Sequence, residues 1–121
     1  MKSYIIAEAG VNHNGDIERA IKMVDVAKSS GADAIKFQTF EPKLICSDNC
    51  PKAEYQQVNT NDTVESQINM LEKLKLKKEE YIKLFNYCKE VEIDFISTPF
   101  DNESANLLES IGVNIYKIGS G

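Results

Sequence analysis

The chain has 121 residues, of which 42% are hydrophobic and 27% charged, a composition typical of a single soluble globular domain. Its formal net charge of -5, without a basic stretch, argues against nucleic acid and anionic membranes as partners. The N-terminus lacks the apolar core of a signal peptide, and no run approaches the roughly 18 apolar residues of a membrane span. We therefore expect a cytoplasmic protein that binds neither nucleic acid nor a membrane.

The apolar pattern predicts strands and helices in alternation. Strands are expected near 4–9, 33–39, 93–97 and 114–118, and helices near 16–30, 78–91 and 102–111. Asp16 stands in N-cap position of the first helix, and Gly31 stands where that helix should end. Such alternation favours a parallel sheet with helical crossovers, either doubly wound or a (β/α)8 barrel. Four strands are half of a barrel of about 250 residues, so we predict an α/β fold: the N-terminal half of a TIM barrel, with four parallel strands, truncated over residues 1–121.

The segment from Glu41 to Lys77 is too long for a routine connection and is expected to be either functional or partly mobile. A short extra helix is predicted over Val64 to Leu74. The part before it, with Pro51, Lys52 and Tyr55, is predicted to be a loop over the barrel mouth.

Polar residues gather where the predicted strands end, which is where a barrel places its active site. The strands end in A-E-A-G-V-N-H-N-G, K-F-Q-T, S-T-P-F and K-I-G-S-G. In the second strand Ile35 and Phe37 alternate with Lys36 and Gln38, so one face should meet the helices and the other should carry an ammonium and an amide inward. An ammonium buried without an anionic partner is costly.

A lysine pair, Lys36 and Lys117, is therefore best explained by an anionic ligand such as a phosphate or a carboxylate. The alternative for each lysine alone is a salt bridge to Glu8 or an exposed strand end. Glu8 in turn either pairs with Lys36 or accepts hydrogen bonds from substrate hydroxyls. The turn G-S-G at 119–121 is a weak signal for backbone donors to phosphate.

His13 is expected to be a hydrogen-bonding turn residue more than a ligand. The three cysteines, Cys46, Cys50 and Cys88, form an odd set without a disulfide pattern, so we expect reduced thiols. A zinc site built from Cys46, Cys50 and His13 is the less favoured alternative.

Five blocks occur in order along the chain: I-A-E-A-G-V-N-H-N-G-D, G-A-D-A-I-K-F-Q-T-F, P-K-A-E-Y-Q, I-S-T-P-F-D and Y-K-I-G-S-G. Together they resemble the N-terminal half of the N-acetylneuraminate (sialic acid) synthase family, from about Tyr4 to Gly121. That family includes synthases of legionaminic and pseudaminic acids and a spore-coat polysaccharide relative. The resemblance implies a TIM-barrel transferase that condenses phosphoenolpyruvate with an N-acetylated amino sugar, N-acetylmannosamine or a relative.

In the implied reaction, C3 of phosphoenolpyruvate attacks the open-chain aldehyde, water adds at C2, and the tetrahedral intermediate loses phosphate. A divalent metal, manganese or magnesium, would polarise the aldehyde. The resemblance also implies roles for residues that share a place at the strand ends. The catalytic lysines that hold phosphoenolpyruvate would be Lys36 and Lys117, and substrate-binding residues would be Glu8, Gln38, Thr98, Phe100 and Ser120.

Other family features fall outside this chain: an acidic residue after G-S-G, the metal-binding histidines, and an antifreeze-like C-terminal domain that reaches the partner's active site in a homodimer. We therefore expect this fragment to hold no metal and to be inactive alone. Two further readings stay open. One is a non-catalytic module that binds acidic sugars or phosphate, and the other is an aldolase that uses Lys36 or Lys117 as a Schiff-base nucleophile.

Overall fold

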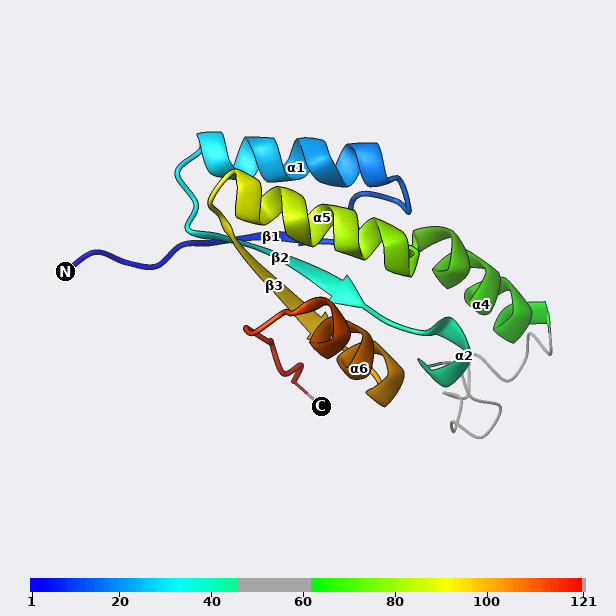
Figure 1. The fold of residues 1–121 in the computed structure, drawn as a ribbon. Helices are drawn as coiled ribbons and strands as arrows, with labels where there is room; N and C mark the ends of the chain where they lie inside the picture. The colour runs from blue at the N-terminus through cyan, green and yellow to red at the C-terminus, as the bar shows by residue number, and fades with distance from the viewer. Residues whose placement is uncertain (46–61, 121) are drawn as a thin grey trace.

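The computed structural model describes residues 1–45 and 62–120 (Figure 1). Its strands are β1 (Ile6–Gly10), β2 (Ala34–Thr39) and β3 (Asp94–Pro99), which form a parallel sheet in the order β1-β2-β3. Its helices are α1 (Ile17–Ser29), α2 (Pro42–Ile45), α4 (Asp62–Leu74), α5 (Lys78–Glu90) and α6 (Asn102–Ile111). The predicted parallel order is confirmed for these three strands. Within the described ranges, no helix is long and apolar enough to cross a membrane.

The helix boundaries follow from capping residues. Asp16 caps α1, where its side chain accepts hydrogen bonds from the backbone N–H of Glu18 and Arg19. Gly31 follows the end of α1 at a φ of +88°, a left-handed conformation that suits glycine. Asp101 caps α6 in the same way as Asp16, through the N–H of Ser104. These capping residues determine where α1 and α6 begin, and therefore how many residues separate each helix from the strand before it.

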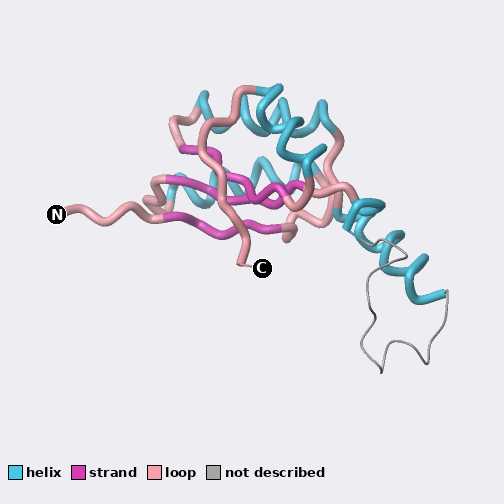
Figure 2. Tube along the Cα trace, turned by 90° about the horizontal axis from the view of Figure 1, so that it is seen from below, coloured by secondary structure: helices cyan, strands magenta, loops and turns pink. Residues whose placement is uncertain are grey.

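The core lies between the sheet and the pair of helices α1 and α5 (Figure 1). Ile35 and Phe37 of β2 are buried there, and the Phe37 ring stacks on Phe95 of β3 with ring centroids 5.6 Å apart. Phe85 of α5 meets Phe95 edge to face at 5.7 Å. Seen from below, the strands lie in front of the helices that cover the far face of the sheet (Figure 2). The predicted alternation of β2, with one face toward the helices, is thereby confirmed.

The fourth strand, predicted near 114–118, is a correction. This segment forms one isolated parallel bridge, from Tyr116 to Ser97 of β3, with one backbone hydrogen bond from the Lys117 N–H to the Ser97 carbonyl. Lys117 and Ile118 are exposed and pair with no further strand among the described residues. One neighbour and one hydrogen bond do not sustain a ladder, so the segment lies in the expected place without becoming a strand.

The long connection after β2 contains more helix than predicted. The extra helix predicted over Val64 to Leu74 is confirmed as α4, but the short helix α2, at Pro42–Ile45, was expected to be loop. Pro51, Lys52 and Tyr55 of the predicted mouth loop lie outside the described residues. Both α2 and α4 lie beyond the carboxyl ends of the strands, where they pack on each other (Figure 1).

Gly15 allows α4 to reach the loop that follows β1. Its φ is +73°, and a Cβ added there would lie 2.0 Å from the backbone carbonyl oxygen of Lys73, near the end of α4. A side chain of any size would therefore push the end of this helix away.

We predict that Gly15→Ala lowers the free energy of unfolding by about 3 kcal/mol or more, because it combines left-handed strain with a backbone clash. Gly31→Ala is the matched control: φ is +88° but nothing lies within 4 Å of the added Cβ, so strain alone should cost about 1 kcal/mol. Urea unfolding of both variants measures the difference. Equal losses would show that the contact with α4 does not constrain Gly15.

Candidate functional site at the strand ends

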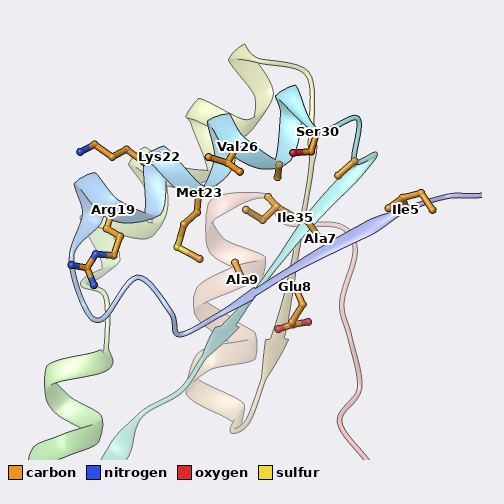
Figure 3. Close-up of a pocket in the computed structure, with 12 residues that line it drawn as sticks. Ile5, Ala7, Glu8, Ala9, Arg19, Lys22, Met23, Val26, Ser30 and Ile35 are labelled. Carbon is orange, nitrogen blue, oxygen red and sulfur yellow. The ribbon is translucent and has the colours of Figure 1, made fainter.

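Glu8 and Lys36 face each other across β1 and β2. They are register partners, and the Lys36 Nζ lies 2.8 Å from Glu8 Oε2. The side chain of Glu8 projects to the side of the sheet opposite Met23 and Ile35, away from α1 (Figure 3). The Lys36 side chain is 21% exposed and that of Glu8 53%, and a solvent-accessible ion pair of this kind contributes little to stability. The salt bridge between Lys36 and Glu8, which the sequence analysis gave as one alternative, is therefore formed. The Lys36 ammonium stays accessible to another anion.

Gln38 lies one step further along the same face, beside a break in the ladder. The register of β1 shifts between Glu8 and Gly10, and Gly10 has a φ of +55°. A Cβ on Gly10 would lie 3.3 Å from Glu8 Oε1 and 3.6 Å from Gln38 Nε2. Glycine at this bulge therefore lets a carboxylate and an amide flank the end of β1.

Thr98 completes this face from β3. It is the register partner of Gln38 and is 6% exposed, and a Cβ built on Gly119 would lie 3.8 Å from its Cγ2. The G-S-G turn thus runs next to the end of β3. Glu8, Lys36, Gln38 and Thr98 share one face of the sheet, at its carboxyl end.

The expected buried lysine pair needs a correction at Lys117. This residue is exposed, and its Nζ donates to the Ile118 carbonyl oxygen, 2.5 Å away. Because Tyr116 packs against the core, alternation along the chain places Lys117 on the face that carries Thr98. Ser120 is exposed as well. Lys117 lacks burial because its segment has one strand beside it and none beyond it among the described residues.

Side chains that the sequence analysis did not single out hold the strand ends in place. The carboxylate of Asp101 accepts from the Glu41 N–H at 2.8 Å, which ties the end of β2 to the start of α6. Lys75 pairs with Glu41 at 2.6 Å, and the Tyr81 hydroxyl donates to the Gln38 carbonyl at 2.8 Å. The sequence indicated a capping role for Asp101, because this aspartate directly precedes a helical pattern. It gave no signal for the contacts of Glu41 and Tyr81, because their partners are distant in sequence.

A small apolar pocket of about 200 Å³ lies over these strand ends. Phe100 of the S-T-P-F motif and Gln38 both line it, so the structure brings these two predicted site residues together. Its other walls come from the loop after β1, the end of β2, α2 and α4: Val11, Phe40, Ile45, Leu71 and Leu74. Among the described residues that line the pocket, Gln38 is the polar one. Sequence spacing could not reveal this pocket, because α4 is far from Gln38 along the chain.

A larger groove, of about 470 Å³, runs between α1 and the edge of β1 (Figure 3). Apolar residues such as Ala7, Met23 and Ile35 form its floor and sides, whereas Arg19 and Lys22 lie toward the N-terminal half of α1. The groove exists because β1 pairs with β2 alone among the described strands. It is on the helix side of the sheet and does not contain the lysines predicted to bind an anion.

His13 is a buried turn residue, as expected. Its Nδ1 accepts from the Gly15 N–H at 3.0 Å, its ring centroid lies 6.0 Å from that of Phe37, and it is 1% exposed. Nε2 is buried and has no hydrogen-bond partner among the described residues. Burial lowers the pKa of His13, opposed by the nearby carboxylates of Glu80 and Asp16. The neutral ring is thus part of the packing under the loop after β1.

The described residues contain no group of three or more His, Cys, Asp or Glu side chains that could hold a metal ion. Cys88 is a buried thiol whose pKa is raised to about 12 by burial, which makes it unreactive as a thiolate. Cys46 and Cys50 lie outside the described residues.

Comparisons with known proteins agree with this architecture. The profile of the NeuB family matches residues 23–121. The chain is 48% identical over 120 residues to the N,N'-diacetyllegionaminic acid synthase of Campylobacter jejuni, and 46% identical over 121 residues to that of Legionella pneumophila. These alignments cover 99% and 100% of this chain but 36% and 34% of the relatives, so the chain spans about a third of their length.

A solved structure extends the likeness to the fold. N-acetylneuraminic acid (sialic acid) synthetase from Leptospira borgpetersenii, in complex with citrate, matches with a TM-score of 0.79 at 33% identity. The match covers 98% of this chain and 36% of that one. The parallel α/β arrangement described above is therefore shared with a sialic acid synthetase.

We predict that stability falls between pH 7 and pH 5 because of His13. Its folded pKa is lowered, so the unfolded chain binds the proton more readily; the stabilisation is complete above the unfolded pKa of about 6.5 and is lost as pH falls from there toward the folded pKa. His13 is the single histidine of the sequence. His13→Asn, whose side-chain oxygen can still accept from the Gly15 N–H, should flatten this part of the urea-unfolding profile. An unchanged pH profile in the variant would contradict the assignment.

Proposed function

Because the chain belongs to the NeuB family, we propose that the full-length protein condenses phosphoenolpyruvate with an N-acetylated amino sugar. The products are a nonulosonic acid and phosphate. This class of product is supported by relatives named as synthases of N,N'-diacetyllegionaminic acid, of pseudaminic acid and of N-acetylneuraminate 9-phosphate. The acceptor is N-acetylmannosamine or a relative, and similarity to two legionaminic acid synthases favours a diacetylated relative.

The observation that carries the proposal is the polar face at the strand ends. Lys36 has its ammonium on this face with an ion-pair partner that costs little to displace. We assign Lys36 and Lys117 to phosphoenolpyruvate and Ser120 to its phosphate. For Lys117 this requires its segment to settle against β3 beyond the single bridge it makes at Tyr116.

The sugar side of the same face is assigned to Glu8, Gln38, Thr98 and Phe100. The Glu8 carboxylate accepts hydrogen bonds from sugar hydroxyls, and Gln38 can both donate and accept. The C3 carbon of phosphoenolpyruvate bonds to the aldehyde carbon, water adds at C2, and phosphate leaves from the tetrahedral intermediate. Lys36, placed between Glu8 and Gln38, positions the anionic reactant next to the sugar.

We further propose that the chain is the N-terminal half of a TIM barrel. The open edge of β1 and the apolar groove beside it support this, because closing a barrel covers that edge with another strand and helix. The activity then belongs to the full-length homodimer in the cytoplasm, and this stretch alone is inactive. Manganese or magnesium, bound in the full-length protein, would polarise the aldehyde of the acceptor.

In the full-length protein, we predict that Lys36→Met raises the KM for phosphoenolpyruvate about tenfold or more, since charge-assisted hydrogen bonds contribute roughly 1.5–3 kcal/mol. Glu8→Gln keeps the shape of the side chain and should mainly raise the KM for the amino sugar. Steady-state phosphate release, with each substrate varied separately, separates the two effects.

Lys83→Met is the matched control. Lys83 also pairs with a glutamate, Glu18, at 3.0 Å, but on the exposed surface of α5 and α1. It should leave both KM values unchanged. If Lys36→Met behaves like Lys83→Met, the assignment of phosphoenolpyruvate to this face is wrong.

A further inference from the structure

We propose that His13 is a pH-sensitive latch between two segments at the carboxyl ends of the strands. In its neutral form the imidazole holds the loop after β1 against the end of α4, and a proton on Nδ1 releases one segment from the other. The contacts of this latch lie within the described residues and do not depend on which substrates the protein binds.

The hydrogen bond to Gly15 determines which neutral form the ring takes. Nδ1 of His13 accepts the Gly15 N–H at 3.0 Å, so Nδ1 carries a lone pair and the proton of the neutral ring is on Nε2. Nε2 is buried without a hydrogen-bond partner among the described residues. The ring therefore contributes one acceptor to the fold, a task that the amide oxygen of asparagine could also perform. What imidazole adds is titration near neutral pH.

The surroundings of the ring favour its neutral form. His13 is 1% exposed, and it takes part in none of the ion pairs of the described residues. Asp16 faces it from the start of α1 and Glu80 from α5, whereas β2 presents the uncharged Phe37 ring and α4 approaches the same loop through backbone carbonyls. Both carboxylates already accept hydrogen bonds from backbone N–H groups at the start of their helices. Burial outweighs their attraction, and the pKa of His13 is lowered.

Protonation would reverse the contact between the ring and Gly15. With a hydrogen on Nδ1, two donors would face each other and the hydrogen bond would be lost. Gly15 has little room to move toward α4, since the position of a Cβ on it lies 2.0 Å from the Lys73 carbonyl oxygen. Asn14 and Gly15 both have left-handed φ values, +57° and +73°, so their turn depends on the contacts around it. We therefore expect the turn to separate from the end of α4 when Nδ1 is protonated.

This separation would reach the small apolar pocket over the strand ends. Val11 of the same loop and Leu74 of α4 both line that pocket. The Asn14 N–H donates to the Val11 carbonyl at 2.9 Å, which connects the turn to the residue in the pocket wall. The spacing of these two walls therefore depends on the latch.

Amide hydrogen exchange of the full-length protein, corrected for its intrinsic pH dependence, tests the latch. Peptides covering 10–16 and 71–76 report on the two segments, and a peptide covering 83–90 of α5 is the internal reference. Once released, the ring has the ordinary pKa of about 6.5, so the closed form is fully favoured above that pH and is lost as pH falls toward the lowered pKa of the buried ring. Over this range, the protection of both segments relative to the reference should fall by up to about tenfold for each pH unit, the slope for one proton.

His13→Asn keeps an acceptor for the Gly15 N–H but cannot titrate, so both segments should keep the same protection from pH 7.5 to pH 5.5. Glu79→Gln is the matched control, because it removes an exposed carboxylate from the first turn of α5 and leaves the histidine in place. Its exchange profile should equal that of the wild type. Wild-type protection that does not change over this pH range would overturn the latch, and so would a His13→Asn profile as steep as that of the wild type. The first of these results needs no variant, so it decides even if His13→Asn fails to fold.

Discussion

Burial of Ile35 and Phe37 beneath α1 and α5 determines which side chains of this sheet are available for chemistry. Both residues are 1% exposed or less, and Phe37 stacks on Phe95 of the next strand. With a period of two, the residues between them must point to the other face. Lys36 and Gln38 therefore lie on the face of the sheet opposite α1 and α5. A register slip by one residue would put the ammonium into the core and the phenyl ring into solvent.

The ends of the strands are organised by contacts that bring distant segments together. Gly10 leaves room between Glu8 and Gln38, and Gly15 admits the end of α4. Glu41 bonds to Asp101 through its N–H and to Lys75 through its carboxylate. This one residue therefore connects the end of β2 to the end of α4 and to the start of α6. These contacts fix the segments around the small apolar pocket, which shares Gln38 with the polar face of the sheet.

The sequence was informative where local chemistry decides structure. The alternation in β2, the caps at Asp16 and Gly31, and the helix ending at Leu74 all depend on residues within a few positions of one another. It was less informative where the outcome depends on a distant partner. The segment near Tyr116 has strand-forming residues but one bridge, because a strand needs neighbours as well as propensity. The apolar pocket joins residues from Val11 to Phe100, and α2 was too short for a periodic pattern to reveal.

The candidate site shows the same division. The placement of Glu8, Lys36, Gln38 and Thr98 on one face follows from strand register, which the alternating pattern sets. The exposure of Lys117 could not be foreseen, because it depends on what lies beyond it. A crystal structure of the full-length protein with phosphoenolpyruvate tests this assignment most directly. We predict that its phosphate or carboxylate lies within hydrogen-bond distance of the Lys36 Nζ and of Lys117, on the face opposite α1. Phosphoenolpyruvate bound elsewhere, with Lys36 still paired to Glu8 alone, would contradict it.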